Sequence, residues 1–285
     1  MTTSDFPLVV SNAMGKVALS TYQAAQSPLK ALSRQRVLPN FKESTSIRLG
    51  EMGRLEPLTE SGEFTHTSRA ENGESLSITT RGRALNVTRV LLVNDDLGLI
   101  GDITAAFGES AAATEADTMV DLVTSNPNLS DGVPVFHASR GNLAAVGTAI
   151  SVASVDAARK AMRGFKGLDG KTLVNVQPKY LLVGPEIETV AEQFLATLNA
   201  TTTANVNPFS GSLQLLIEPR IEGNDWWIFP DPARLPCLQH GYLAGAEGVQ
   251  IQRTEAWDTL SIRYRAWLDF GAGWLDAKAY MNPGV

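Results

Sequence analysis

The chain has 285 residues and a mass of 30.6 kDa, which fits one elaborated domain or two intertwined subdomains. Its 44% hydrophobic and 19% charged residues exclude wholesale disorder, and its net charge of -6 has the wrong sign for a protein that mainly grips phosphates. The single cysteine excludes an intrachain disulfide, and no apolar run of about 18 residues predicts a membrane span.

Charge is segregated along the sequence. Residues 1–50 carry six basic and two acidic side chains, a net of +4, whereas residues 51–124 carry five arginines and thirteen acids, a net of -8. This pattern is compatible with an ordinary solvated surface. It is also compatible with a basic N-terminal arm that meets an acidic stretch of a neighbouring copy, because opposite charges register association.

Residues 43–84 contain only 8 large apolar side chains among 42 residues, too few for a core of their own. Apolar and polar residues alternate at 46–49 and at 75–79, and glycines and a proline lie between, which predicts a two-stranded ribbon. An isolated hairpin is marginally stable in water, and we expect its own subunit to offer no surface for it. The ribbon is therefore predicted to be an intersubunit arm; the alternative is a disordered surface loop.

The middle of the chain alternates between strand and helix signals. Residues 90–93 are typical of a buried strand, and residues 102–123 predict a helix of roughly 30 Å with a weak apolar stripe. The acidic pair at 95 and 96 is favoured as part of a turn or cap. Ser154 is predicted to cap a short helix that ends at Met162.

The C-terminal half contains the clearest signals. Residues 180–183 predict a buried strand, followed by a helix with an apolar stripe from Ile187 to Leu198. Residues 213–218 and 226–229 predict a hairpin, and strict alternation at 260–268 predicts a strand. This mixture of strands and helices indicates an α+β fold.

No catalytic template is satisfied. Gly170-Lys171-Thr172 lacks the earlier glycine of a phosphate-binding loop and is favoured as a turn. His137 is favoured as a structural residue and Cys237 as a small buried hydrophobe. We therefore expect no catalytic residue, cofactor or metal, and a structural or assembly role.

Several segments, in order, resemble a known family. PKYLLVGPE at 178–186 and its helix resemble the apical-domain helix entry of tailed-phage major capsid proteins. SNPNLSDG at 125–132 and VFHASRGNL at 135–143 resemble the segment after the long helix in Mu-like major head subunits. LQLLIEP at 213–219 with WWIF at 226–229 is similar to the apical hairpin, and residues 264–284 are similar to the closing peripheral-domain strand and tail.

The resemblance implies the Hong Kong 97 type capsid fold, with an N-terminal arm, an extended β-hairpin loop, a long spine helix, a peripheral domain and an apical domain. The implied ranges are 1–40 for the arm, 41–93 for the extended loop with flanking strands, 94–177 for the spine helix and peripheral domain, 178–245 for the apical domain, and 246–285 for returning peripheral-domain strands and the tail.

The function implied is that of a major capsid (head) protein without enzymatic activity. Its copies would form hexamers and pentamers that close into an icosahedral shell around double-stranded DNA, assembled in the host bacterial cytoplasm and found in the virion. Further implied partners are a portal, a scaffold or maturation protease, non-specifically contacted DNA and a possible decoration protein, without a membrane. The alternatives are an encapsulin-like compartment shell and, remotely, a hydrolase with an unrecognised site.

We predict that the assembly interface draws on charged residues of the arm and ribbon. The candidates are Arg34, Arg36, Arg48, Glu51, Arg54, Glu56, Glu60, Glu63, Arg69 and Glu71.

Overall fold

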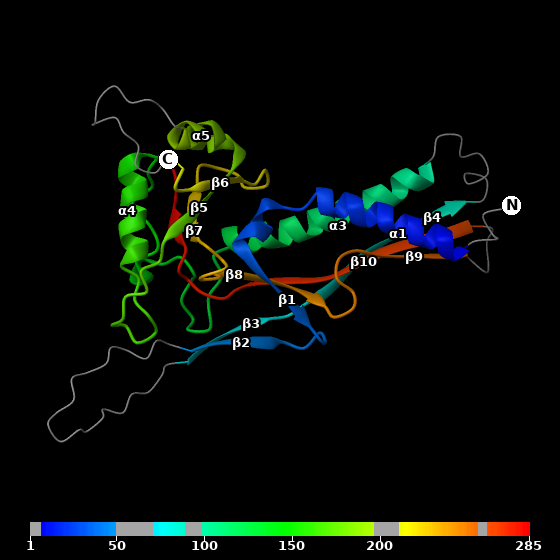
Figure 1. Cartoon of the computed structure of the whole chain (residues 1–285), viewed down its shortest axis with the longest axis horizontal. Coiled ribbons are helices and arrows are strands. Elements are labelled where there is room, and N and C mark those ends of the chain that lie inside the picture. Colours follow the sequence, from blue (N-terminus) through cyan, green and yellow to red (C-terminus); the bar gives the residue numbers. More distant parts are fainter. Residues whose placement is uncertain (1–6, 50–70, 89–98, 197–210, 256–260) are drawn as a thin grey trace, which may run out of the picture.

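The structure, a computed structural model, describes residues 7–49, 71–88, 99–196, 211–255 and 261–285. It is elongated, with two long helices lying along a long sheet at one end and a smaller sheet with two further helices at the other (Figure 1). The helices are α1 (Pro7–Ala24), α3 (Leu99–Thr124), α4 (Val152–Arg163) and α5 (Glu188–Leu195), with 3-10 turns η2 (Pro28–Leu32), η3 (Ala138–Arg140) and η4 (Pro185–Ile187).

The larger sheet has five strands arranged around β10. They are β1 (Ser33–Leu38), β8 (Leu238–Leu243), β10 (Ser261–Trp274), β4 (Thr79–Thr88) and β9 (Gln250–Glu255). β10 runs antiparallel to β4, β8 and β9, and β1 runs parallel to β8. The predicted strand at 260–268 is confirmed and extends further, to Trp274. Tyr264 is buried while Arg263 and Arg265 are exposed, as the alternation requires.

The smaller sheet has the order β11-β7-β5-β6, and its strands are β5 (Pro178–Val183), β6 (Gln214–Ile217), β7 (Trp226–Pro230) and β11 (Tyr280–Asn282). The predicted hairpin of β6 with β7 is wrong, because β5 lies between them, parallel to β6 and antiparallel to β7. β5 takes this central place because Leu181, Leu182 and Val183 are fully buried. The chain passes from β6 to β7 over the end of β5, where a Cβ on Gly184 would lie 2.5 Å from the carbonyl oxygen of Ile221.

The long helix α3 confirms the helix predicted at 102–123, and its buried face includes Ala112, Ala116 and Met119. Helix α1, which the sequence analysis did not predict, packs along α3. A Cβ on Gly108 would lie 2.4 Å from the carbonyl oxygen of Ala18, so the close approach of the two helices requires glycine there. The range expected as an arm therefore contains elements that pack on their own chain.

Two predicted helix boundaries need correction. Ser151, not Ser154, is the N-cap of α4; Ser154 is the third residue of the helix and completes a reciprocal capping box with Ser151. Helix α5 ends at Leu195, because Ala196 has an extended backbone with ψ of 138°. The end of the predicted stripe, Leu198, lies outside the described residues, and within the stripe Val190 is 45% exposed.

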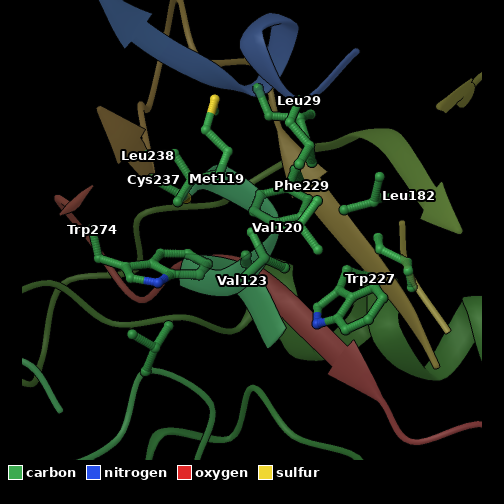
Figure 2. Close-up of a cluster of buried hydrophobic side chains, with 14 of the residues drawn as sticks. Leu29, Met119, Val120, Val123, Leu182, Trp227, Phe229, Cys237, Leu238 and Trp274 are labelled. Carbon is green, nitrogen blue, oxygen red and sulfur yellow. The ribbon is translucent and has the colours of Figure 1, made fainter. Parts of the chain in front are cut away.

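Two apolar clusters hold the molecule together. The first lies between α3 and both sheets and includes Leu29, Met119, Val120, Val123, Leu182, Trp227, Phe229, Cys237, Leu238 and Trp274 (Figure 2). The second lies between the smaller sheet and helices α4 and α5. Because strand side chains alternate, Trp227 enters the first cluster and Trp226 the second, so the smaller sheet is covered on both faces.

Each sheet combines strands from more than one of the ranges expected from the resemblance. β8 lies within 178–245 but belongs to the five-stranded sheet, and β11 lies within 246–285 but belongs to the four-stranded sheet. The predicted strand at 90–93 and the acidic pair at 95 and 96 lie outside the described residues.

Candidate assembly interface

The predicted ribbon is present at its base. Strands β2 (Ser44–Leu49) and β3 (Glu71–Leu76) pair antiparallel, with Ser44 opposite Leu76 and Leu49 opposite Glu71. Among the described strands they pair with each other alone. The second strand predicted at 75–79 is interrupted, because β3 ends at Leu76 and β4 begins at Thr79. The connecting residues 50–70 lie outside the described part of the chain.

The base of the ribbon is anchored on its own subunit, so the expectation that the subunit offers it no surface is wrong there. The Glu74 carboxylate is buried and accepts hydrogen bonds from the Ser130 backbone N–H at 3.2 Å and its hydroxyl at 2.7 Å. Leu76 and Ile78 are buried in a small cluster with Leu38. The alternation of buried residues at 74, 76 and 78 thus serves intramolecular packing.

Glycines allow the ribbon to cross the larger sheet at close range. A Cβ on Gly271 of β10 would lie 2.0 Å from the carbonyl oxygen of Ser77. On Gly241 of β8 it would lie 2.9 Å from Leu38 Cδ1 and 3.0 Å from Leu76 Cδ2. The backbone contact at Gly271 is too short for any Cβ, so the crossing requires glycine there, whereas at Gly241 a Cβ would displace the ends of two leucine side chains. The ribbon therefore leaves the body in a direction set by the sheet.

Two of the predicted interface residues, Arg34 and Arg36, lie on strand β1. The Arg36 guanidinium donates to the hydroxyls of Ser46 and Ser44, the latter at 3.3 Å, and to Gln239 Oε1 at 3.4 Å. Arg36 therefore ties the ribbon to β8 within its own chain. Arg34 is exposed and has no hydrogen-bond or ion-pair partner within the described ranges.

The other eight predicted residues are placed only in part. Arg48 and Glu71 lie on β2 and β3, with Arg48 opposite Asn72. The remaining six, Glu51, Arg54, Glu56, Glu60, Glu63 and Arg69, lie outside the described residues.

One face of the ribbon base remains open. Ser44 and Ser46 face Arg36, whereas Ile47 is 67% exposed. Ile47 is therefore available for contact with another chain.

A buried polar cluster, missed by the sequence analysis, joins the N-terminal segment to α3 and β8. Lys30 forms an ion pair with the fully buried Glu115, and the Tyr22 hydroxyl donates to Glu115 Oε1 at 2.5 Å. The hydroxyls of Tyr22 and Tyr242 are 3.0 Å apart. Burial, together with the Glu115 carboxylate, raises the pKa of both tyrosines, which stay neutral hydrogen-bonding groups. A visible signal was Glu115 itself, a charge amid the alanines of the buried face of α3.

A second polar link joins the same segment to the smaller sheet. The Ser27 hydroxyl donates to the buried carboxylate of Glu218. Arg220 donates to Glu218 Oε1 at 3.0 Å and pairs with Asp117 of α3 at 2.7 Å. Because Glu218 and Asp117 both have hydrogen-bond or ion-pair partners, these contacts hold the N-terminal segment, α3 and the β6–β7 connection in one arrangement.

His240 is buried in β8, and its Nδ1 lies 2.7 Å from the Ser33 hydroxyl. Burial, and then the nearby Lys30 charge, lower the pKa of His240 to about 4. The imidazole is therefore neutral near pH 7 and acts as a structural hydrogen-bonding group.

The residues considered in the sequence analysis as catalytic, phosphate-binding or metal-binding candidates have structural roles. The His137 imidazole accepts from the Ser139 backbone N–H and caps η3, and Cys237 is buried in the core. Gly170 has φ of 67° in a turn whose Asp169 carboxylate accepts from the Lys171 and Thr172 backbone N–H groups. The described residues contain no group of three or more histidine, cysteine or acidic side chains suited to a metal. None of the helices in the described ranges is long and apolar enough to span a bilayer.

Comparisons with known proteins agree on one class. A family model described as phage capsid protein matches residues 73–280. No curated protein matches the chain. Among solved structures, the capsid of cyanophage P-SCSP1u matches with a TM-score of 0.61 at 10% identity, covering 91% of this chain and 88% of that one.

Two further structures match over similar lengths. The capsid of Ralstonia phage GP4 has a TM-score of 0.59 at 9% identity and covers 92% of each chain. A structure from Microbacterium phage Oxtober96 has a TM-score of 0.56 at 12% identity and covers 91% of each chain. At such low identity these matches establish the fold, which is the Hong Kong 97 type.

Proposed function

The chain belongs to the phage capsid protein family and is a major capsid protein, and from this premise we propose that its copies form hexamers and pentamers that close into an icosahedral shell around double-stranded DNA. The observation that carries the assembly proposal is the ribbon. Its base is fixed to the body by Glu74 and Leu76, while Ile47 faces outward. A fixed base with an open outer face suits an arm that lies on a neighbouring copy.

The mechanism we propose is repetition of modest contacts. A single ribbon contact contributes little, but closure of the shell makes each copy bind several neighbours at once, which multiplies weak interfaces into a stable particle. Within this arrangement we assign the apical region to the smaller sheet with α4 and α5, and the peripheral region to the larger sheet with α3.

Further partners follow from the same role. The capsid of the virion is where the protein acts, and we propose that it assembles in the host bacterial cytoplasm with a portal and a scaffold or maturation protease. A decoration protein is a further partner in this proposal. DNA would be contacted without sequence specificity, and the subunit itself would carry no catalytic activity.

The ribbon test replaces residues 51–70 by a short glycine-rich turn and keeps β2 and β3. We expect the variant to fold, because Glu74, Leu76 and Ile78 remain, and to form no shells. Circular dichroism and thermal unfolding check the body, and negative-stain microscopy checks assembly. Normal shells from this variant would refute the role of the ribbon. Particles from the native source that hold protein cargo instead of DNA would favour a compartment shell.

For the charged residues, we propose that Arg34 and the ribbon charges face a neighbouring copy. Arg34→Glu should leave the free energy of unfolding unchanged and weaken assembly most at low salt, because Arg34 has no partner in the described part of its own chain. Arg36→Glu is the matched comparison and should lower subunit stability, because Arg36 holds Ser44 and Gln239. Equal effects of the two substitutions on assembly and stability would argue against this assignment.

A further inference from the structure

Two surfaces of opposite charge lie on the helices that cover the smaller sheet. We define the basic surface by residues of α4 and the loop after it, and the acidic surface by residues of η4 and α5. The basic surface comprises Arg159, Lys160, Arg163, Lys166 and Lys171 with Asp156 and Asp169 among them, a net of +3, and the acidic surface comprises Glu186, Glu188 and Glu192, a net of -3.

We propose that the basic surface of one copy binds the acidic surface of the next copy in the same ring. The helices that carry them pack at opposite edges of the smaller sheet, α4 beside β11 and α5 beside β6 (Figure 1). A contact between different surfaces of identical subunits is heterologous, and such contacts close into rings when the rotation allows. This inference rests on the proposed assembly and adds the contact that orders subunits within a ring.

The carboxylates of the acidic surface have no counter-charge among the described residues. None of its three carboxylates has a hydrogen-bond or ion-pair partner within the described residues. Glu188 and Glu192 are four residues apart on one short helix, a like-charge spacing that weakens the helix that carries it. The following residues 197–210 contain no lysine, arginine or histidine, so they supply no counter-charge. Within the described residues and 197–210 these carboxylates have no counter-charge, so they are available to a cation of another copy.

The basic surface carries an excess of positive charge. Asp156 pairs with Arg159 at 2.6 Å and with Lys160 at 2.7 Å, although the Lys160 side chain remains 77% exposed. Among the described residues, the Arg163 guanidinium donates only to the amide oxygen of Asn175, at 3.5 Å. The ammonium groups of Lys166 and Lys171 form no ion pair in the described ranges, although the charge of Lys171 acts on the nearby Asp169 carboxylate. Two carboxylates, Asp156 and Asp169, thus offset only part of the five positive charges on this helix and loop.

Each surface also carries exposed apolar side chains. Val190 on α5 is 45% exposed, and on the other surface Val152 of α4 is 43% exposed and Leu173 is 57% exposed. Apolar contacts among charges of opposite sign provide area to bury, while the charges steer and register the approach. The partner that fits both features is a second copy of this chain, since it presents both surfaces at once.

The test is a charge swap. The acidic reversal carries Glu186→Lys, Glu188→Lys and Glu192→Lys; the basic reversal carries Lys160→Glu, Arg163→Glu and Lys166→Glu; a third variant combines both sets. Because five of the six side chains are exposed and Glu188 is half-buried, we expect the dissociated subunits to unfold close to the wild-type temperature. A matched control reverses three exposed acids elsewhere, Glu109, Glu222 and Glu247.

Light scattering and negative-stain microscopy give the critical concentration for assembly at low and high salt. At low salt, each reversal should raise this concentration about 10-fold or more, because it places like charges together, and the combined variant should return to within about 3-fold of the wild type. The control should assemble like the wild type.

Four outcomes would overturn the proposal. Wild-type assembly by the acidic reversal, or no rescue in the combined variant, would exclude this contact while the shell function stands. Loss of packaged DNA in the basic reversal alone, with normal shells, would reassign the basic surface to nucleic acid. Failure of the wild type to form rings or shells would overturn the proposed function and this inference with it.

Discussion

The two sheets of the subunit differ in how completely one copy covers them. In the smaller sheet, β7 is buried along its whole length, with Trp226 facing one apolar cluster and Trp227 the other. In the larger sheet, β4 is exposed at nine of its ten positions, only Val87 being buried, and it pairs with β10 alone among the described strands. The inner strand β7 of the smaller sheet is thus covered within one copy, whereas the edge strand β4 of the larger sheet is exposed.

This difference separates stability from assembly. An exposed edge strand offers unpaired backbone groups that monomeric proteins usually shield. In a capsid protein, such an edge is available for contacts between subunits. We therefore expect the smaller sheet and its supporting polar clusters to set the stability of the free subunit, and β4 to contribute little to it.

The largest effect is expected from Trp226→Ala in the smaller sheet. The substitution removes a fully buried side chain whose indole N–H donates to the Thr148 carbonyl at 2.9 Å. It should lower the free energy of unfolding of the dissociated subunit by about 3–5 kcal/mol, measured by urea denaturation. Val190→Ala, on the exposed side of α5, is the control and should change it by less than about 0.5 kcal/mol. Similar losses for both would contradict the comparison.

A somewhat smaller loss is expected from Lys30→Met, because it leaves the buried Glu115 without its cation. Removing one partner of a buried ion pair typically costs about 3 kcal/mol or more, while replacing both partners costs far less. Urea denaturation of Lys30→Met, of Glu115→Gln and of the double variant that carries both measures the coupling free energy between the two side chains. If the double variant is less stable than Lys30→Met alone, the ion pair does not explain the loss.

The third prediction concerns pH and His240. Its pKa is about 4 in the folded subunit and about 6.5 in an unfolded chain, so between these values the unfolded chain binds the extra proton. Stability should therefore fall as pH decreases from 6.5 to 4, by up to about 3 kcal/mol from this group, and the contribution should be constant outside that window. His240→Gln should flatten the decrease in denaturation curves across pH 4–6.5. His137→Gln, at an exposed position, is the matched control for removing a histidine.

The smallest effect is expected on β4. Leu85→Ala removes a side chain that is 42% exposed on the edge strand. The free energy of unfolding of the dissociated subunit should change by less than about 0.5 kcal/mol. A loss above about 2 kcal/mol would mean that β4 is as integral to the subunit as the smaller sheet, and the contrast between the sheets would not hold.

Local patterns predicted several elements of this fold. Strict alternation identified β10, the long helical pattern identified α3, and sparse apolar content with two alternating stretches identified the base of the ribbon. These features depend on residues close in the sequence, so their periodicity is visible there. The capsid family was likewise predicted from ordered segments of the chain.

Pairings between distant segments were harder to predict. The order β6-β5-β7 was missed because adjacency in the sequence favoured a hairpin, whereas the burial of β5 on both faces placed it in the middle. Of the predicted interface residues, Arg36 is hydrogen-bonded within its own subunit, because the ribbon crosses β8 beside it. No local sequence pattern reveals this crossing.

The sequence by itself determined the α+β composition, the long helix and a ribbon too poor in apolar residues to form a core. Only the tertiary structure decided which partner each charged side chain has. Lys30 forms an ion pair with Glu115, 85 positions away in the sequence, and Glu74 accepts a hydrogen bond from Ser130. The carboxylates of Glu186, Glu188 and Glu192 have no cationic partner among the described residues. The reason is physical: periodicity depends on neighbouring residues, whereas pairing of a charge depends on distances that exist only after the chain has folded.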